Sequence, residues 1–144
     1  MTICGRRAEV LEAAAEKIIE AAAFGGSVQI VTGDVTEEEQ VAAIVAKALE
    51  PTGKLDGCIA NAGGGGMLFG YENMDTREFL RVLHLNVLGT MLSIKHTLPA
   101  MIAAGGGSFV GMSSLAGHIT QRPFQRARTQ PDYVDLDAGR ARGT

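Results

Sequence analysis

Short apolar runs alternate with longer segments in which apolar residues recur every three or four positions. From Val10 to Ala23 pairs of apolar residues repeat every four positions, which predicts a helix with one apolar stripe that ends at Gly25-Gly26. The intervening helices have the length of a crossover connection. The pattern therefore predicts an α/β fold with a parallel sheet in the order β-α-β-α-β-α-β. The runs that predict strands are TIC (2–4), SVQIV (27–31), LDGCIA (55–60) and SFVGMSS (108–114).

Polar residues mark where the second and third helices begin. Thr36 with Glu39 has the spacing of a capping box, and Asp75 with Glu78 predicts a second helix start of the same kind. The third helix, over 79–104, is apolar on nearly all faces, which predicts burial against both a sheet and a second element.

The pattern disappears after Gly117. Residues 121–144 hold five of the nine arginines and no lysine, and they show neither a strand period nor a helix period. We therefore expect one domain over 1–120 and a disordered tail over 121–144. A basic arm that binds nucleic acid is a weaker interpretation, because Asp132, Asp135 and Asp137 interrupt the positive charge.

Composition narrows the class of protein. A chain of 144 residues has room for one core, and a net charge of −3 gives no general attraction to nucleic acid or acidic membranes. Cys4 and Cys58 lie in apolar runs without the spacing of metal ligands, so buried free thiols are expected. No signal peptide or membrane span is evident, which predicts a soluble cytoplasmic protein.

Five short motifs occur in a definite order: GRR after the first strand, GDVT after the second, ANAG after the third, LNVLG in the long helix, and GMSSLAG at the fourth strand. In this order and at these intervals they resemble the short-chain dehydrogenase/reductase (SDR) family over about residues 2–124. The resemblance implies a partial Rossmann-like fold and an NAD(P)(H)-dependent oxidoreductase that acts on a carbonyl or a secondary alcohol.

The resemblance also implies cofactor contacts. Arg6 matches the position that pairs with a 2′-phosphate, and Gly5 stands where NAD-preferring members carry an acid, so NADP(H) is favoured and NAD remains possible. The alternative is that Arg6 is merely solvated at a helix start. Asp34 matches the aspartate that meets the adenine ring, although it could equally cap the next helix. The motif that shapes the cofactor cleft corresponds to Asn61, Ala62 and Gly63, with Ala60 in place of the usual asparagine.

Two further positions match catalytic residues. Asn86 resembles the asparagine that supports a proton-relay water. A buried amide needs hydrogen-bond partners, so a functional role would explain an asparagine in so apolar a helix. The alternative is a structural amide in the core whose hydrogen bonds are all made within the protein. Ser114 matches the serine that hydrogen-bonds the substrate carbonyl, with Ser113 as the second choice. The histidines have no evident partner and are expected to be structural or surface residues: His84, His96 and His118.

The resemblance also implies a tyrosine that protonates the carbonyl oxygen, usually thirteen residues after the serine, and a lysine four residues after that tyrosine; this pair cannot be found here. Counting thirteen residues from Ser114 reaches Ala127, and the tyrosine further on, Tyr133, is followed four residues later by Asp137. No lysine occurs after Lys95. Without a nearby cation to lower its pKa of about 10, a phenol is a poor acid–base group at neutral pH. We therefore expect no hydride transfer by this chain alone.

The family's first strand and helix are missing as well. In the usual strand order 3-2-1-4-5-6 that strand lies in the middle, so the first two strands here are expected to have no bridge to the last two. We hypothesise an incomplete member whose tail is read out of frame from near Gln125. If a one-base shift of the coding DNA restores no Tyr-x-x-x-Lys segment, this hypothesis fails.

Three functions stay open at this point. The first is the oxidoreductase, with a nicotinamide cofactor and a small carbonyl or alcohol as ligands and with neither nucleic acid nor membrane as partner. The second is a non-catalytic module that forms a homo-oligomer, or pairs with a complete paralogue, through the long apolar helix. The third is an unstable gene remnant.

Overall fold

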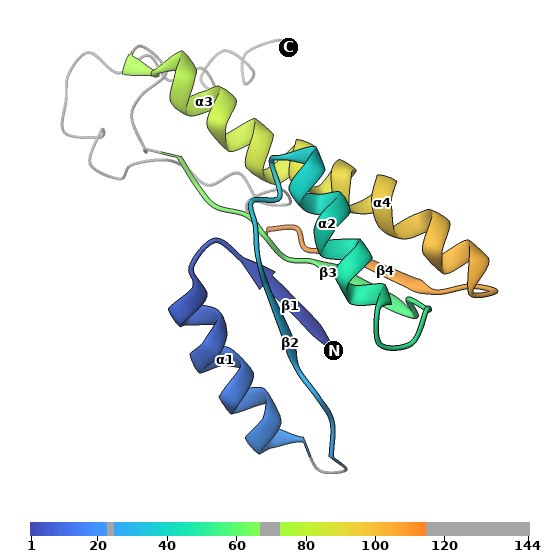
Figure 1. Ribbon diagram of the computed structural model, residues 1–144. Helices are drawn as coiled ribbons and strands as arrows, with labels where there is room; N and C mark the ends of the chain where they lie inside the picture. Colours follow the sequence, from blue (N-terminus) through green and yellow to red (C-terminus); the bar gives the residue numbers. More distant parts are fainter. Residues whose placement is uncertain (23–24, 67–72, 115–144) are drawn as a thin grey trace, which may run out of the picture. The chain divides into compact units, whose positions relative to one another are not determined.

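The structure, a computed structural model, describes residues 1–22, 25–66 and 73–114 (Figure 1). The chain divides into two compact units, Met1–Met112 and Ser113–Thr144, and the described helices and strands lie in the first. The predicted tail and the boundary at residue 120 fall outside the described residues. In chain order the elements are β1 (Thr2–Gly5), α1 (Ala8–Ala21), β2 (Gln29–Thr32), α2 (Glu38–Leu49), β3 (Gly57–Ala60), α3 (Thr76–Leu83), the π-helix η2 (His84–Leu88), α4 (Gly89–Ala103) and β4 (Ser108–Gly111).

The strands form two separate parallel pairs. β1 pairs with β2, with Ile3 beside Ile30, and β3 pairs with β4, with Ile59 beside Val110. Within the described part of the chain no strand joins the two pairs. The predicted β-α-β order and the parallel pairing are confirmed, and among the described residues the first two strands have no bridge to the last two, as expected.

Helices cover the strands and hold the two pairs in one unit. α1 packs on β1 and β2, α2 lies against β2, and α4 lies against β3 and β4 (Figure 1). α2 and α4 also contact one another, and Glu38 of α2 pairs with Lys95 and His96 of α4. The buried apolar side chains of the described residues are Leu11, Val41, Leu92 and Met101.

The two predicted helix starts differ in outcome. Asp75 is the N-cap of α3 and accepts a hydrogen bond from the Arg77 N–H at 2.9 Å, as predicted. The predicted capping box at Thr36 is wrong, because α2 begins one residue later, after Glu37. The Thr36 hydroxyl donates to Asp34 Oδ1 at 2.8 Å, and the N-cap of α2 makes no side-chain hydrogen bond to the helix.

The long apolar helix is not an α-helix throughout. The π-helix η2 separates α3 from α4, a change of winding that apolar periodicity does not reveal. Burial against a sheet is confirmed for α4, but burial on a second side is wrong for side chains such as Met91 and Ile102, which are exposed. Cys4 is also exposed, contrary to expectation.

Within residues 1–22, 25–66 and 73–114, every helix falls short of the length and hydropathy that a membrane span requires.

Candidate cofactor site

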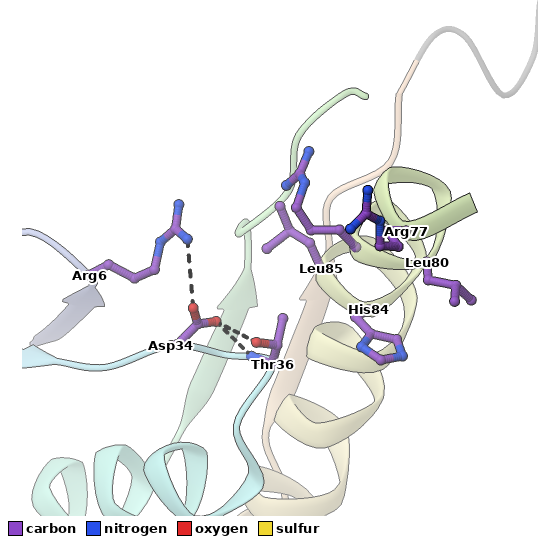
Figure 2. Close-up of a pocket in the computed structure, with 8 residues that line it drawn as sticks. Arg6, Asp34, Thr36, Arg77, Leu80, His84 and Leu85 are labelled. Carbon is purple, nitrogen blue, oxygen red and sulfur yellow. Dashed lines mark hydrogen bonds and ion pairs between the residues drawn. The ribbon is translucent and has the colours of Figure 1, made fainter. Parts of the chain in front are cut away.

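The first part of the site lies at the carboxyl ends of β1 and β2. Arg6 follows β1 and Asp34 follows β2 by two residues; because the strands are parallel, both residues reach the same edge. Arg6 Nη1 lies 3.7 Å from Asp34 Oδ2 (Figure 2). The Arg6 side chain is 72% exposed, so it remains available to an anion that approaches from solvent.

Asp34 is held by four hydrogen bonds, of which one runs from the Glu37 N–H to the Asp34 carbonyl at 3.1 Å. Its Oδ1 accepts from the Thr36 N–H at 3.0 Å and from the Thr36 hydroxyl at 2.8 Å, and its own N–H donates to Gln40 Oε1 at 2.8 Å. The Thr36 N–H is the main cause of a lowered pKa at Asp34; partial burial opposes it, and the Thr36 hydroxyl and the Arg6 guanidinium add to it. Asp34 is therefore a fixed anionic acceptor at neutral pH.

Asp34 does not cap α2, whose N-cap is Glu37. It forms a turn of its own ahead of the helix, which removes the alternative role considered from the sequence. Gln40 could not be predicted from the sequence, because its spacing gives no sign that its amide oxygen accepts from the Asp34 N–H six residues earlier.

A pocket of about 390 Å³ opens beside this pair (Figure 2). Asp34 supplies an acceptor, Arg6 a cation and Leu85 an apolar wall, so the lining suits a planar ring joined to an anionic group. A second hollow of about 220 Å³ shares Arg6 and Asp34 and reaches Gln40. The residues that line the larger pocket are Arg6, Asp34, Thr36, Arg77, Leu80, Arg81, His84 and Leu85.

The cations on α3 are already engaged. Arg81 pairs with Glu78 at 2.7 Å, which lowers the pKa of Glu78 through that hydrogen bond. Arg77 lies 3.7 Å from Asp75. Neither position was predicted, because the sequence gives no sign that α3 faces the ends of β1 and β2.

The second part of the site is built around Asn86. Its Oδ1 accepts from the Gly64 N–H at 3.0 Å, and its Nδ2 donates to the Gly64 and Val82 carbonyls, both at 2.8 Å. A Cβ added at Gly63 would lie 2.8 Å from Asn86 Oδ1. Glycine is therefore required at this position if the amide is to reach the loop.

Asn86 lies in the middle of the π-helix, where the Gly89 N–H bonds to the His84 carbonyl. The expectation that Asn86 is buried is wrong, since it is exposed, but its amide is satisfied by backbone atoms of the glycine loop. A π-turn of this kind is frequent at functional sites. The Thr90 hydroxyl also donates to the Asn86 carbonyl, at 3.0 Å.

Gly89 connects the two parts of the site. A Cβ at Gly89 would lie 2.9 Å from Val35 Cγ2, so the loop that carries Asp34 packs directly on the start of α4. This contact gives a physical reason for the glycine in the LNVLG motif. It also places the Asp34 turn beside the π-helix that carries Asn86.

The remaining predicted positions lie in the loop after β3, after β4 and on the long helix. The Asn61 N–H donates to the Ile59 carbonyl at 3.1 Å, and Ala62 continues the exposed loop. Ser113 and Ser114 follow β4 in the chain and belong to the second unit. His84 lines the pocket and His96 contacts Glu38 Oε1 at 3.1 Å, while His118 lies outside the described residues.

Comparison with known proteins identifies the family. The model of the short chain dehydrogenase family matches residues 1–125, and the chain belongs to this family. Cis-4-hydroxycyclohexanecarboxylate dehydrogenase of Sinomonas cyclohexanicum is 38% identical over 88 residues, which is 61% of this chain and 35% of that protein. Cyclohexanol dehydrogenase of Acinetobacter sp. (strain SE19) is 33% identical over 109 residues, 76% of this chain and 43% of that protein. The chain thus spans less than half the length of these relatives.

Solved structures agree with this assignment. A short-chain type dehydrogenase/reductase from Mycobacterium ulcerans is similar with a TM-score of 0.80 and 36% identity, over 85% of this chain and 45% of that one. A metagenomic short-chain oxidoreductase in complex with NADP has a TM-score of 0.73 and 29% identity, over 82% and 52%. NAD⁺-bound xylitol dehydrogenase has a TM-score of 0.78 and 29% identity, over 85% and 46%. The two parallel strand pairs therefore belong to a Rossmann-like fold, in a family that uses nicotinamide cofactors.

Proposed function

We propose that this chain binds a nicotinamide dinucleotide by its adenosine end, with NADP(H) preferred to NAD(H). The Arg6–Asp34 pair supports this proposal most directly. The Asp34 carboxylate offers an acceptor to the amino group of an adenine ring that lies against Leu85, and the exposed Arg6 guanidinium complements a 2′-phosphate. The similar solved structures include both an NADP complex and an NAD⁺ complex, so they do not decide between the two cofactors. The proposed preference for NADP(H) therefore rests on Arg6.

The glycine loop supports the same proposal. Asn61, Ala62 and Gly63 bring backbone close to a ligand, and the Asn86 amide holds the next residue, Gly64, in place. In this proposal Asn86 positions the loop, and its neighbouring backbone orders a proton-relay water. Ser114 would hydrogen-bond the substrate oxygen. The bound cofactor would supply or accept the hydride.

The proposed reaction is oxidation of a secondary alcohol, or reduction of the corresponding carbonyl. The relatives are named for alcohols on six-membered rings, which makes cyclic secondary alcohols the first substrates to test. The 144-residue chain alone is proposed to be inactive, because no tyrosine in it is followed four residues later by a lysine. Turnover of NADPH above that of a Ser114→Ala control would overturn the proposed inactivity.

Calorimetric titration of NADPH and then NADH into the 144-residue chain tests cofactor binding. We expect saturable binding of NADPH and weaker binding of NADH. If a folded sample binds neither nucleotide, the proposal is wrong.

A second function is favoured by one observation on α3, η2 and α4. Apolar side chains on these helices remain exposed, including Val87, Met91 and Ile102, of which Ile102 is 68% exposed. Such a surface would be covered in a homo-oligomer or in a complex with a complete paralogue. Sedimentation of wild-type chain beside an Ile102→Lys variant tests this, since a monomer in both samples would exclude it.

A further inference from the structure

The glycine loop, residues 61–66, runs along one face of η2 and α3. A Cβ added at Gly64 would lie 3.5 Å from Leu85 Cδ2, and one added at Gly66 would lie 3.0 Å from Val82 Cγ2. The contacts move toward the start of α3 as the loop advances, so the loop and the helix run in opposite directions. The lack of a side chain at Gly66 allows this close approach to the helix.

Arg81 joins the loop to α3. Its Nη2 donates to the Gly65 carbonyl at 3.3 Å. The same guanidinium donates to both carboxylate oxygens of Glu78, from Nε to Oε2 and from Nη2 to Oε1, each at 2.7 Å. Two parallel hydrogen bonds fix the plane of a guanidinium as well as its position. The donor that reaches Gly65 therefore has its direction set by Glu78.

The Glu78–Arg81 pair adds little to the stability of α3 itself. The two residues are three positions apart and share one side of the helix, and their side chains are 29% and 51% exposed. Ion pairs that solvent reaches so readily contribute little to folding. The main consequence of this pair is therefore the contact with the loop.

We propose that Arg81 is a positioning residue for nucleotide binding, which holds the glycine loop through the Gly65 carbonyl. The inference rests on the proposed function, in which residues 61–63 contact the cofactor. Asn86 holds Gly64 and Arg81 holds the next residue, so the loop is attached to the helix at two adjacent points. Two attachments restrict the loop before the ligand arrives, which lowers the ordering cost of binding.

The proposal separates Arg81 from Arg6. A 2′-phosphate contact acts on NADPH alone, whereas the shape of the loop matters equally to NADPH and NADH. Arg81 also lines the larger pocket, so its charge could act directly on an anionic ligand. Arg81→Lys distinguishes the two effects, because lysine keeps the charge and loses the planar fork that engages Glu78 and Gly65 together.

Hydrogen exchange by NMR on the nucleotide-free 144-residue chain tests the attachment of the loop. We expect Arg81→Ala to speed exchange at the Gly64 N–H at least about threefold, since opening of the loop no longer breaks the Gly65 contact. The Gly33 N–H bonds to the Gly5 carbonyl at 2.9 Å in the other strand pair. Its exchange should stay unchanged, whereas a general loss of stability would speed both amides.

Titration calorimetry tests the effect on binding. We expect Arg81→Ala and Arg81→Lys to weaken NADPH and NADH by the same factor, about threefold, and Glu78→Gln to do so by less. Lys47→Ala is the matched control. It removes an ion pair with the same spacing and the same 2.7 Å distance, to Glu50, at the end of α2. Its affinities and its Gly64 exchange should stay within about 1.5-fold of wild type.

Three results would overturn the proposal: unchanged Gly64 exchange in Arg81→Ala, wild-type exchange and affinities in Arg81→Lys, or a loss confined to NADPH. The first would show that Arg81 does not hold the loop, and the other two that its charge acts directly on the ligand. Failure of the wild-type chain to bind either nucleotide would instead overturn the proposed function. Gly64 exchange would then still decide whether Arg81 holds the loop.

Discussion

The Arg6 guanidinium is exposed and forms an ion pair with the Asp34 carboxylate, with 3.7 Å between Nη1 and Oδ2. A hydrogen bond to a charged group contributes about 1.5–3 kcal/mol, and exposure to solvent favours the lower end of that range. We therefore expect Arg6→Ala to weaken NADPH binding about tenfold in titration calorimetry and to leave NADH binding within about twofold. Arg7→Ala is the matched control, since Arg7 carries the same charge next to the pocket but does not line it. Equal losses for both nucleotides would contradict a role in 2′-phosphate binding.

The Asn86 side chain holds the glycine loop through hydrogen bonds to the Gly64 backbone. Its amide makes three hydrogen bonds, and exposed neutral bonds contribute about 0.5–1.5 kcal/mol each at most. We expect Asn86→Ala to speed hydrogen exchange at the Gly64 N–H at least about fivefold and to lower the unfolding free energy by about 1 kcal/mol. Asn86→Asp keeps the oxygen that accepts from the Gly64 N–H but places a second oxygen opposite the Gly64 and Val82 carbonyls, so it should lose the protection as well. Unchanged Gly64 exchange in Asn86→Ala would show that the loop holds its shape without the amide.

At the scale of elements, α2 and α4 are joined by a charge cluster. The Lys95 hydrogen bond, and after it the His96 contact, lower the pKa of Glu38. A carboxyl whose pKa is lower in the folded state stabilises the fold above its unfolded pKa of about 4.3 and loses this contribution as pH falls through the folded pKa. Urea unfolding followed between pH 7 and pH 3 should thus show a smaller acid loss for Glu38→Gln than for wild type. Glu39→Gln, on the same turn, is the control and should keep the wild-type dependence.

Elements with strong periodicity could be predicted from the sequence, and the departures have local causes. The four strands and the Asp75 cap of α3 are present where apolar runs and a capping aspartate indicate them. The π-helix could not be predicted, because it coincides with tertiary contacts, of Asn86 with the glycine loop and of Gly89 with Val35, that spacing does not reveal. The capping box was not formed, because Asp34 holds Thr36 in a turn ahead of the helix and α2 begins after Glu37.

At the scale of the whole molecule, the order of motifs predicted the family and the absent bridge between strand pairs. The motifs also pointed to Arg6 and Asp34, which the structure brings together at one strand edge. The opposite wall of the pocket, from Arg77 to Leu85, could not be predicted, because it depends on how α3 is placed relative to β1 and β2. Pairwise placement of elements is a tertiary property that neither spacing nor composition specifies.

The two open sheets should also determine how the molecule unfolds. None of the described side chains is less than 2% exposed, and two-stranded sheets are marginally stable by themselves. We expect the isolated chain to unfold over a broad thermal range and to bind a dye for apolar surfaces, as a loosely packed state does. NADPH at about a hundredfold its dissociation constant should add about 2.7 kcal/mol and raise the midpoint, and the gain should be smaller for Arg6→Ala at the same concentration. A sharp calorimetric transition without dye binding would contradict this expectation, because it would require a core that is closely packed without a ligand.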